Sequence, residues 1–414
     1  MQKKLLVLGG KPIGSTELVE KARALGYYTI VADYLPKESS HAKQYANEDW
    51  LISTGELDML EALSREAEVD GVWAGVHEFN IDKAVRLARR LGLPEVCTQE
   101  QWEQCDNKRF FKDMCVKFGI PVTKEFSYQN KEQIVYPVIC KPTDSSGSRG
   151  FSICTNEAEL DKGYQHALDF SASGNVLVEQ YMPYDSVIIH YTFVKGKAVL
   201  STISDKRSML LDGGGSVMAL QTFPAVHIDA YREALDAKAQ DMFRALGITD
   251  GVAWIEAFDN NGEFTFNEMG LRLGGSLTNY PVKYFTGADQ LELLIKKAVG
   301  DTYSLADIAQ EGFKKYAILP LHIKSGEIAA IHGEDIVKAM EEVYAYVPVH
   351  FVGDVIEDWG SAQNVMCYLH ILYDTFEELK NSIKNIINNL NVCGTKGEEL
   401  LYCLYDIERL GCDR

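Results

Sequence analysis

The chain has 414 residues, of which 46% are hydrophobic and 24% are charged, so it can bury sizeable cores in roughly two to four domains or subdomains. Its 60 acidic and 41 basic residues give a formal net charge of −19 without a basic block, which argues against nucleic-acid and anionic-membrane surfaces. No apolar run approaches the ~20 residues of a membrane span or resembles a signal peptide. Nine cysteines without a Cys-x-x-Cys spacing indicate reduced thiols, so we expect a cytoplasmic protein without a structural metal.

The first hundred residues alternate between short apolar segments and amphipathic ones. Strands are predicted at residues 4–8, 28–32 and 71–74, and helices at residues 15–25, 59–65 and 81–91. Such alternation predicts a doubly wound domain with a parallel sheet over residues 1–106.

A glycine turn at residues 9–14, with Asp33 at the end of the next strand, also fits a dinucleotide-binding domain that transfers hydride. That fingerprint is poor, because the Gly-x-Gly-x-x-Gly spacing is broken and Pro12 intrudes. Glu78 follows the predicted strand 71–74, where loops at the edge of such a sheet bind ligands. It is therefore a candidate substrate contact, with a solvated loop acid as the equal alternative.

Three helices are predicted in the rest of the chain. Residues 107–118 form an amphipathic helix whose polar face carries Lys108, Arg109 and Lys112. Asp289 and Glu292 predict a capping box for a helix that ends at Gly300. In the helix predicted at residues 375–390, the apolar stripe consists of Leu379, Ile383, Ile386 and Ile387. This spacing indicates core packing.

Residues 141–150 form a loop between two predicted strands. Backbone N–H groups could approach an anion closely at its small residues Ser146, Gly147 and Ser148. Lys141 and Arg149 supply positive charge, so the loop resembles a phosphate clamp, with an ordinary hairpin turn as the alternative.

The polar segment 204–216 is rich in glycine and lies between two further strands. Its Lys206 and Arg207 could order around an acyl phosphate or an amine substrate, although surface loops of this composition are common.

Residues 251–275 predict a β-hairpin with a turn at residues 259–262. Glu256 and Glu268 are expected at neighbouring strand ends, followed by Arg272. Paired carboxylates beside an arginine suit divalent cations that bridge phosphate oxygens. Two exposed acids on a solvated hairpin would be the alternative if no other segment handled phosphate.

In their order along the chain, these motifs resemble the ATP-grasp superfamily, in the branch of carboxylate-amine ligases related to biotin carboxylase and the carbamoyl-phosphate synthase large chain. The likeness covers nearly the whole chain. It implies a multidomain α/β and α+β fold with an N-terminal doubly wound domain at residues 1–106 and an ATP-grasp domain at 107–313. A mobile lid is expected at about 121–182, and an α+β subdomain at 314–414 that shapes the dimer or the substrate entrance.

The resemblance also implies the residues of the site. For ATP these are Lys108, Lys141, Ser146, Gly147, Ser148, Arg149, Glu179, Gln180 and Met182, with Glu179 accepting from the adenine amino group. Glu256 and Glu268 would hold Mg²⁺, with Mn²⁺ as a substitute, and Arg272 would be catalytic. For the other substrates the expected residues are Glu78, Lys206, Arg207, Gly274, Gly275 and Ser276.

Two positions depart from the family pattern. Val187 stands where many relatives carry a ribose-binding acid, a contact that Asp185 or His190 would have to replace. Gly270 stands at the asparagine of Glu-x-Asn-x-Arg, so either one metal is held more weakly or the activity has drifted. If a ligand is missing, Gly270→Asn should raise magnesium affinity in a folded protein. A need for positive φ is the alternative reason for this glycine.

We therefore expect an ATP-dependent ligase that activates a carboxylate as an acyl phosphate and joins it to an amine, releasing ADP and phosphate. Its partners would be small molecules and a second copy of the chain in a homodimer, with no nucleic acid and no membrane. One alternative is phosphorylation of bicarbonate or formation of carbamoyl phosphate. The other is a nucleotide-binding regulatory protein that has lost turnover.

Overall fold

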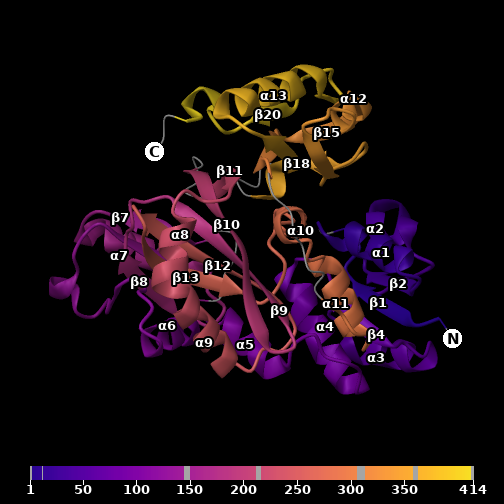
Figure 1. Cartoon of the computed structure of the whole chain (residues 1–414), viewed down its shortest axis with the longest axis horizontal. Coiled ribbons are helices and arrows are strands. Elements are labelled where there is room, and N and C mark those ends of the chain that lie inside the picture. Colours follow the sequence, from indigo (N-terminus) through magenta and orange to yellow (C-terminus); the bar gives the residue numbers. More distant parts are fainter. Residues whose placement is uncertain are drawn as a thin grey trace.

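The computed structural model describes residues 2–11, 13–143, 150–210, 216–304, 313–357 and 362–411 (Figure 1). They form one parallel sheet and several antiparallel sheets with helices packed against them, which confirms the predicted mixture of α/β and α+β architecture. Among the described residues, none of the helices combines the length and the apolar character that a membrane-spanning segment requires.

The N-terminal sheet is parallel and has the strand order β3-β2-β1-β4. Its strands are β1 (Lys4–Leu8), β2 (Tyr28–Asp33), β3 (Glu48–Leu51) and β4 (Gly71–Ala74). The helices of this domain are α1 (Ser15–Ala24), α2 (His41–Tyr45), α3 (Leu57–Glu66) and α4 (Glu78–Leu91), with a short 3-10 turn η1 (Lys37–Ser39). Strands that are covered on both faces are apolar along their length, as in β1, where four consecutive residues are fully buried.

Two consecutive helices, α5 (Gln99–Asp106) and α6 (Lys108–Lys117), lead to the next domain. Asn107 ends the first and caps the second, because its side chain accepts from the backbone N–H groups of Arg109 and Phe110. The expectation that Lys112 lies on a polar face of this helix is wrong. Its side chain is buried, because α6 packs against the elements that carry Thr123 and Glu179.

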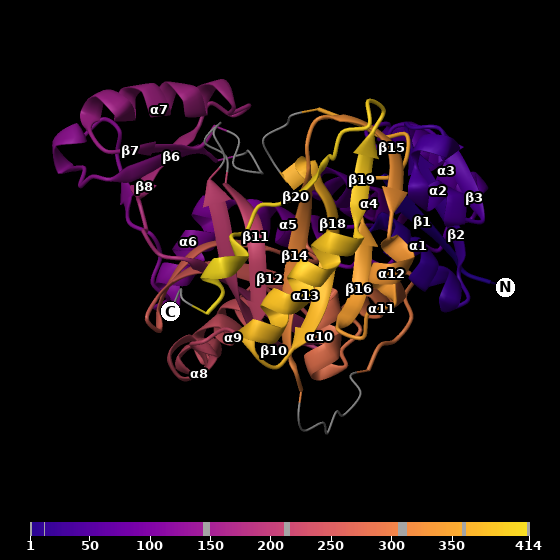
Figure 2. The ribbon, with the colours of Figure 1, turned by 90° about the horizontal axis from the view of Figure 1, so that it is seen from above.

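A small antiparallel sheet with the order β5-β8-β6-β7 follows. It consists of β5 (Glu125–Phe126), β6 (Val138–Pro142), β7 (Ser152–Cys154) and β8 (Val176–Gln180), with the helix α7 (Glu157–Asp169) and the turn η2 (Lys131–Gln133). Its own small hydrophobic core lies under α7. In Figure 2, α7 and this sheet project from one side of the body of the protein. This unit lies within the predicted lid, and its motion remains a prediction.

The largest sheet has the order β13-β12-β9-β10-β11-β14-β18-β16, with β20 also paired to β14. Its strands are β9 (Ser186–Val194), β10 (Lys197–Leu210), β11 (Ser216–Phe223), β12 (Gly251–Asn260), β13 (Glu263–Gly270), β14 (Lys315–Ile323), β16 (Val343–Pro348), β18 (Val365–Tyr373) and β20 (Leu401–Cys403). Since β11 pairs with β14, one sheet continues across the predicted boundary at residue 313. Residues 204–207 lie inside β10, so placing Lys206 and Arg207 in a surface loop was wrong.

Helices cover one side of this sheet, and the last of them also contacts the N-terminal domain. They are α8 (Ile228–Tyr231), the π-helical turn η3 (Arg232–Asp236), α9 (Ala237–Ala245), α10 (Asn279–Thr286) and α11 (Gln290–Ala298). Only half of the predicted capping box forms at α11. The Asp289 side chain accepts from the Glu292 backbone N–H, but the Glu292 carboxylate pairs with Lys21 and Lys296 instead.

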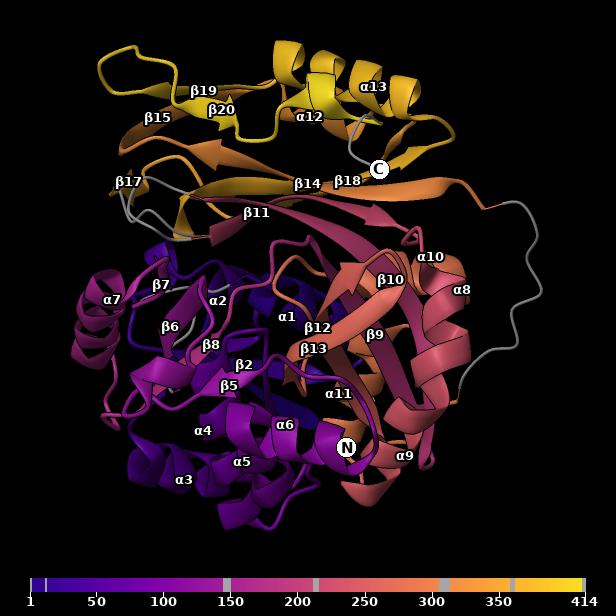
Figure 3. The same ribbon diagram turned by 90° about the vertical axis from the view of Figure 1, so that its left-hand side faces the viewer.

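The C-terminal part adds a second layer above β14 and β18 (Figure 3). It contains β15 (Gly326–His332), β17 (Val355–Ile356), β19 (Asn391–Gly394), α12 (Glu334–Lys338), α13 (Phe376–Asn389) and the short turns η4 (Ala362–Asn364) and η5 (Ile407–Arg409). Thr375 and Glu378 form a capping box at α13, whose apolar stripe packs into the core as the sequence predicted. His41 stacks on Phe351 at 3.4 Å between ring centroids, which ties this layer to the N-terminal domain.

Three buried histidines generate a prediction about acid stability. Burial lowers the pKa of His190 and His370 to about 3 and that of His322 to about 4. Because the unfolded chain protonates near pH 6.5, it binds more protons than the folded chain below that pH, so folding stability falls as the pH drops from 6.5 towards 4. Each histidine contributes roughly 1 kcal/mol to the loss between pH 7.5 and 5.5.

His322 offers the cleanest test, because neither ring nitrogen has a hydrogen-bond partner in the described part of the chain. We expect His322→Phe to lose less unfolding free energy between pH 7.5 and 5.5 than the wild type, measured by urea titration. The control is His332→Phe, which replaces an exposed histidine. An equal pH dependence in wild type and His322→Phe would contradict the assignment.

Candidate active site

A cavity of about 800 Å³ lies where the small sheet, the large sheet and the N-terminal domain meet. Nine residues that the sequence singled out line it: Glu78, Lys108, Lys141, Met182, Asp185, Lys206, Glu256, Glu268 and Arg272. Apolar residues of the small sheet and of the segment that follows it, including Ile139, Ile153 and Tyr181, form part of its wall. The cavity thus has a charged part beside an apolar part, a combination typical of ligand sites.

The two central carboxylates face each other across the hairpin of β12 and β13, where Glu256 pairs in register with Glu268. Both carboxylates lie within their strands, so the expectation that they lie at the strand ends was wrong. The register shifts next to this pair, so that Asn267 is an extra residue on β13. A bulge of this kind re-aims a side chain, and Asn267 and Glu268 consequently both line the cavity.

Asn267 is a site residue that the sequence analysis missed. Its side-chain oxygen accepts a hydrogen bond from Lys141 Nζ at 3.1 Å. The alternation of a regular strand would direct Asn267 away from the face that carries Glu268. The bulge is therefore needed to place it, and no residue in the hairpin sequence signals that bulge.

Glu256 is neutralised by neighbours on other strands. Lys206 Nζ on β10 donates to its Oε1 at 2.7 Å, and Ser186 Oγ on β9 donates to the same atom at 2.8 Å. Burial acts to raise the pKa of Glu256, but the charge and hydrogen bond of Lys206 outweigh burial and lower it. The carboxylate is therefore ionised at neutral pH, in the form that binds a cation. Lys206 lies beside this carboxylate, while Lys108 Nζ lies 3.9 Å from Glu268 Oε2.

Glu179 is fully buried and contacts two lysines. Lys112 pairs with its Oε1, and Lys141 Nζ lies 2.7 Å from its Oε2. Burial favours the neutral acid, but the positive charges of Lys141 and Lys112 outweigh burial and lower the pKa of Glu179. The structure thus places the Glu179 carboxylate behind Lys141, outside the wall of the cavity. Its predicted contact with adenine remains a prediction.

Arg272 joins the hairpin to the N-terminal domain. Its Nη2 donates to Glu78 Oε1 at 2.6 Å, and its Nη1 donates to the backbone oxygen of Leu273 at 2.9 Å. Burial would raise the pKa of Glu78, but the nearby charge of Arg272 outweighs it and holds the pKa below its usual value. The guanidinium carbon lies 5.1 Å from the centre of the Trp254 ring. The predicted catalytic arginine and one predicted substrate residue are therefore in direct contact.

A steric constraint that the sequence did not reveal explains why residue 270 is a glycine. It lies in β13 opposite Trp254, and it is not among the glycines with positive φ, so that explanation is wrong. A Cβ atom at this position would lie 2.6 Å from two atoms of the Trp254 ring. Gly270→Asn would displace this ring, and the expectation that this variant keeps its fold stays a prediction. The space at Gly270 is filled by Trp254.

Several predicted residues do not reach the cavity wall. Gln180 donates to the Pro137 backbone oxygen, Arg207 pairs with Asp185, and Ser276 Oγ donates to Gln221 Oε1. Gly274 and Gly275 are also absent from the wall, and Ser146, Gly147, Ser148 and Arg149 lie outside the described residues, as does the glycine-rich part of the segment 204–216.

The two residues that the sequence offered for a ribose contact, Asp185 and His190, differ in their position relative to the cavity. Val187 and His190 are buried in β9, where His190 stacks on Phe223, and neither lines the cavity. Asp185 does line it, so it is the better of the two candidates that the sequence offered for a ribose contact.

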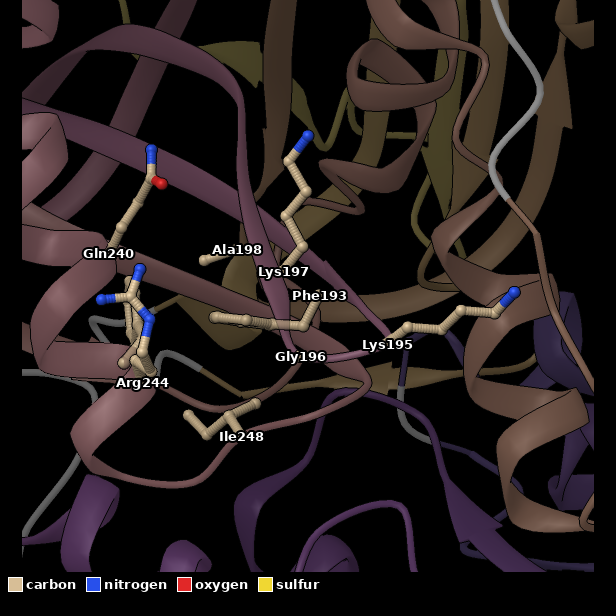
Figure 4. A pocket seen from close by; sticks show the side chains of 9 residues that line it. Phe193, Lys195, Gly196, Lys197, Ala198, Gln240, Arg244 and Ile248 are labelled. Atoms are coloured by element: carbon tan, nitrogen blue, oxygen red, sulfur yellow. The ribbon is translucent and has the colours of Figure 1, made fainter.

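A second pocket, of about 180 Å³, lies between the β9–β10 turn and α9 (Figure 4). Lys195, Lys197 and Arg244 line it, but the two lysine side chains extend in different directions. Its described lining contains no carboxylate, so we assign the candidate active site to the cavity of about 800 Å³.

Comparisons with known proteins agree with this geometry. Residues 111–306 match the family model "Carbamoyl-phosphate synthase L chain, ATP binding domain". A formate-dependent phosphoribosylglycinamide formyltransferase from Wolinella succinogenes is 25% identical over 287 residues, which cover 65% of this chain and 70% of that protein. For relatives of the same name from Sulfurisphaera tokodaii, Bacillus subtilis and Methanocaldococcus jannaschii, the match covers 52%, 50% and 48% of their length.

Two solved structures show the same fold. The biotin carboxylase domain dimer of Hydrogenobacter thermophilus 2-oxoglutarate carboxylase, in complex with MgADP, ADP and bicarbonate, superposes with a TM-score of 0.80 at 16% identity, covering 97% of this chain and 91% of that chain. An L-amino acid ligase from Bacillus licheniformis gives a TM-score of 0.75 at 19% identity, covering 95% and 99%. Over residues 111–306 the match to the family model agrees with the ATP-grasp domain that the sequence predicted, and over nearly the whole chain the two structures share its fold.

The position of Lys141 generates a prediction about nucleotide binding. Lys141→Met keeps most of the side-chain volume but removes a cation that lines the cavity beside Glu179 and Asn267. We expect ATP affinity to fall roughly ten- to a hundredfold by calorimetry, the scale of one hydrogen bond to a charged group. Arg109→Ala, which removes an exposed cation from α6, is the control and should bind ATP normally. Unchanged affinity in Lys141→Met would remove Lys141 from the nucleotide site.

Proposed function

Because the chain carries an ATP-grasp domain, we propose that it is an ATP-dependent ligase that forms a carbon–nitrogen bond between a carboxylate and an amine. The observation that carries the proposal is the charged end of the cavity. Two carboxylates face each other there, and Lys108, Lys141, Lys206 and Arg272 line the same cavity. The curated relatives, named as formyltransferases that depend on formate, and the fold shared with an amino acid ligase support this class of reaction.

In the proposed reaction, a carboxylate oxygen of the substrate attacks the γ-phosphorus of ATP, and ADP leaves with the electrons of the broken bond. The amine nitrogen then attacks the acyl carbon of the acyl phosphate, inorganic phosphate leaves, and the nitrogen loses one proton. Neither step requires a nucleophilic side chain. Catalysis of phosphoryl transfer rests mainly on positioning and charge neutralisation, which the lysines and Arg272 are suited to supply.

The site fits Mg²⁺, and we propose that Mn²⁺ can substitute for it. Glu256 and Glu268 provide two oxygen donors in register, and the lowered pKa of Glu256 keeps it ionised. No cluster of three or more metal-binding side chains occurs in the described part of the chain, so phosphate oxygens and water would complete the coordination. Such an ion neutralises charge on the transferring phosphoryl group.

The remaining contacts follow from the lining of the cavity. Lys108 and Lys141 would meet the phosphates, and the apolar wall near Met182 would hold the adenine ring. A lid at about 121–182, which contains the small sheet and α7, would close over the phosphates. Closure of this kind excludes water, which protects an acyl phosphate from hydrolysis.

Glu78 and Arg272 are proposed to meet the other two substrates. A carboxylate suits an amine, and a guanidinium suits a carboxylate or the phosphoryl group that it accepts. The homodimer and the cytoplasmic location predicted from the sequence stay predictions, with the biotin carboxylase dimer as support for the former. Bicarbonate phosphorylation remains the second candidate, because the same similar structure contains bicarbonate.

The deciding experiment measures ADP release with Mg²⁺-ATP and a panel of carboxylates, including formate and amino acids, each with and without amines. We expect ADP release that requires both a carboxylate and an amine, and Arg272→Ala should lower its kcat by about 10²–10³ while ATP affinity is kept. Arg86→Ala, on the surface of α4, is the matched control.

The other outcomes separate the alternatives. Turnover with bicarbonate but no amine would favour the second candidate. ATP binding without ADP release across the panel would indicate a regulatory protein and contradict the proposal.

A further inference from the structure

We infer that Trp254 is a positioning residue for Arg272 and that Gly270 is required because it leaves room for the Trp254 ring. This inference rests on the proposed function in one respect only, namely that Arg272 acts in catalysis. The stability measurements that test the contact itself need no substrate.

The first step is steric. Trp254 on β12 and Gly270 on β13 are directly paired across the hairpin. The ring lies over the glycine so closely that a Cβ at residue 270 would be 2.6 Å from Cε2 and Nε1 and 2.7 Å from Cζ2. Carbon atoms do not approach so closely without displacement, so any side chain at residue 270 would move the ring. The Trp254 ring can therefore keep this position only if residue 270 is glycine.

The second step concerns the guanidinium. Its carbon lies 5.1 Å from the Trp254 ring centre, within the range of a cation–π interaction. The Glu78 carboxylate at 2.6 Å and the Leu273 carbonyl at 2.9 Å hold its two terminal nitrogens. Arg272 Nε–H has no partner among the described residues. Ring, carboxylate and carbonyl together restrict the rotation of a long side chain that is only 12% exposed.

The third step connects the contact to catalysis. A substrate amine that binds Glu78 would compete with Arg272 for that carboxylate, since both are cations. If Glu78 were taken by the amine, the Trp254 ring and the Leu273 carbonyl would still hold the guanidinium in the cavity. Trp254 thus keeps Arg272 in place during the step in which charge develops on the phosphoryl group. On this account, residue 270 is glycine and not asparagine because the Trp254 side chain of the neighbouring strand occupies the space beside it.

Two variants disturb the contact in different ways. Trp254→Leu removes the aromatic face, and Gly270→Ala keeps the ring but displaces it. We expect each to lower kcat roughly two- to thirtyfold with ATP affinity unchanged, the range that a cation–π contact spans. Trp254→Phe retains a ring face and should keep kcat within about threefold of the wild type. Gly55→Ala, where a Cβ makes only ordinary contacts, is the matched glycine control.

Coupling between the two positions tests the shared mechanism. In Trp254→Leu/Gly270→Ala the aromatic face is already absent, so we expect the loss in kcat to match that of Trp254→Leu alone. Additive losses, or a normal kcat in Trp254→Leu, would overturn the inference. A kcat that falls equally in Trp254→Phe and Trp254→Leu would also overturn it, because it would show that bulk alone matters.

Unfolding measurements keep the inference falsifiable if no substrate pair is turned over. In that case the proposed function fails, but urea titrations of the wild type, Trp254→Leu, Arg272→Met and the double variant still measure the coupling between ring and guanidinium. A favourable coupling supports the contact, and independent effects of the two substitutions contradict it. Gly270→Ala should destabilise the wild type more than it destabilises Trp254→Leu, since a clash requires the ring.

Discussion

Two carboxylates facing each other inside a cavity are the constraint on which the rest of the site depends. Like charges in direct register repel and resist burial, so this pair of carboxylates requires cations around it. Those cations come from distant parts of the chain, Lys108 on α6, Lys141 on β6 and Lys206 on β10. The convergence of three elements on one hairpin is what brings the small sheet and the large sheet to the same cavity.

Neutralisation continues behind the cavity wall. Lys141 pairs with the buried carboxylate of Glu179, which Lys112 also contacts. Lys141 lines the cavity, whereas Glu179 and Lys112, which hold it in place, lie outside the cavity wall. Removing one partner of such a buried cluster is costly, about 3–5 kcal/mol, because it leaves an uncompensated charge. A loss of ATP binding in a Glu179 variant would therefore mix folding with recognition. In Lys141→Met, Lys112 still pairs with Glu179, and a urea titration of that variant separates the two effects.

Sequence reasoning found what depends on local pattern. The strands at residues 4–8 and 71–74, the hairpin, and the helix α13 with its apolar stripe follow from apolar periodicity and turn residues. It missed what depends on pairing between segments: the bulge that turns Asn267 inward, the burial of Lys112, and the ring that explains Gly270. Each is set by the register or packing of a partner element, on which the neighbouring residues in the sequence carry no information.

The central claim, that the facing carboxylates bind ATP through a divalent cation, has one direct test. ATP affinity is measured by calorimetry with and without Mg²⁺ in the wild type, Glu268→Gln and Glu256→Gln. The account predicts that Mg²⁺ strengthens ATP binding in the wild type and that this gain is largely lost in both variants, because an amide keeps an oxygen but not the charge. Equal gains from Mg²⁺ in all three proteins would contradict it.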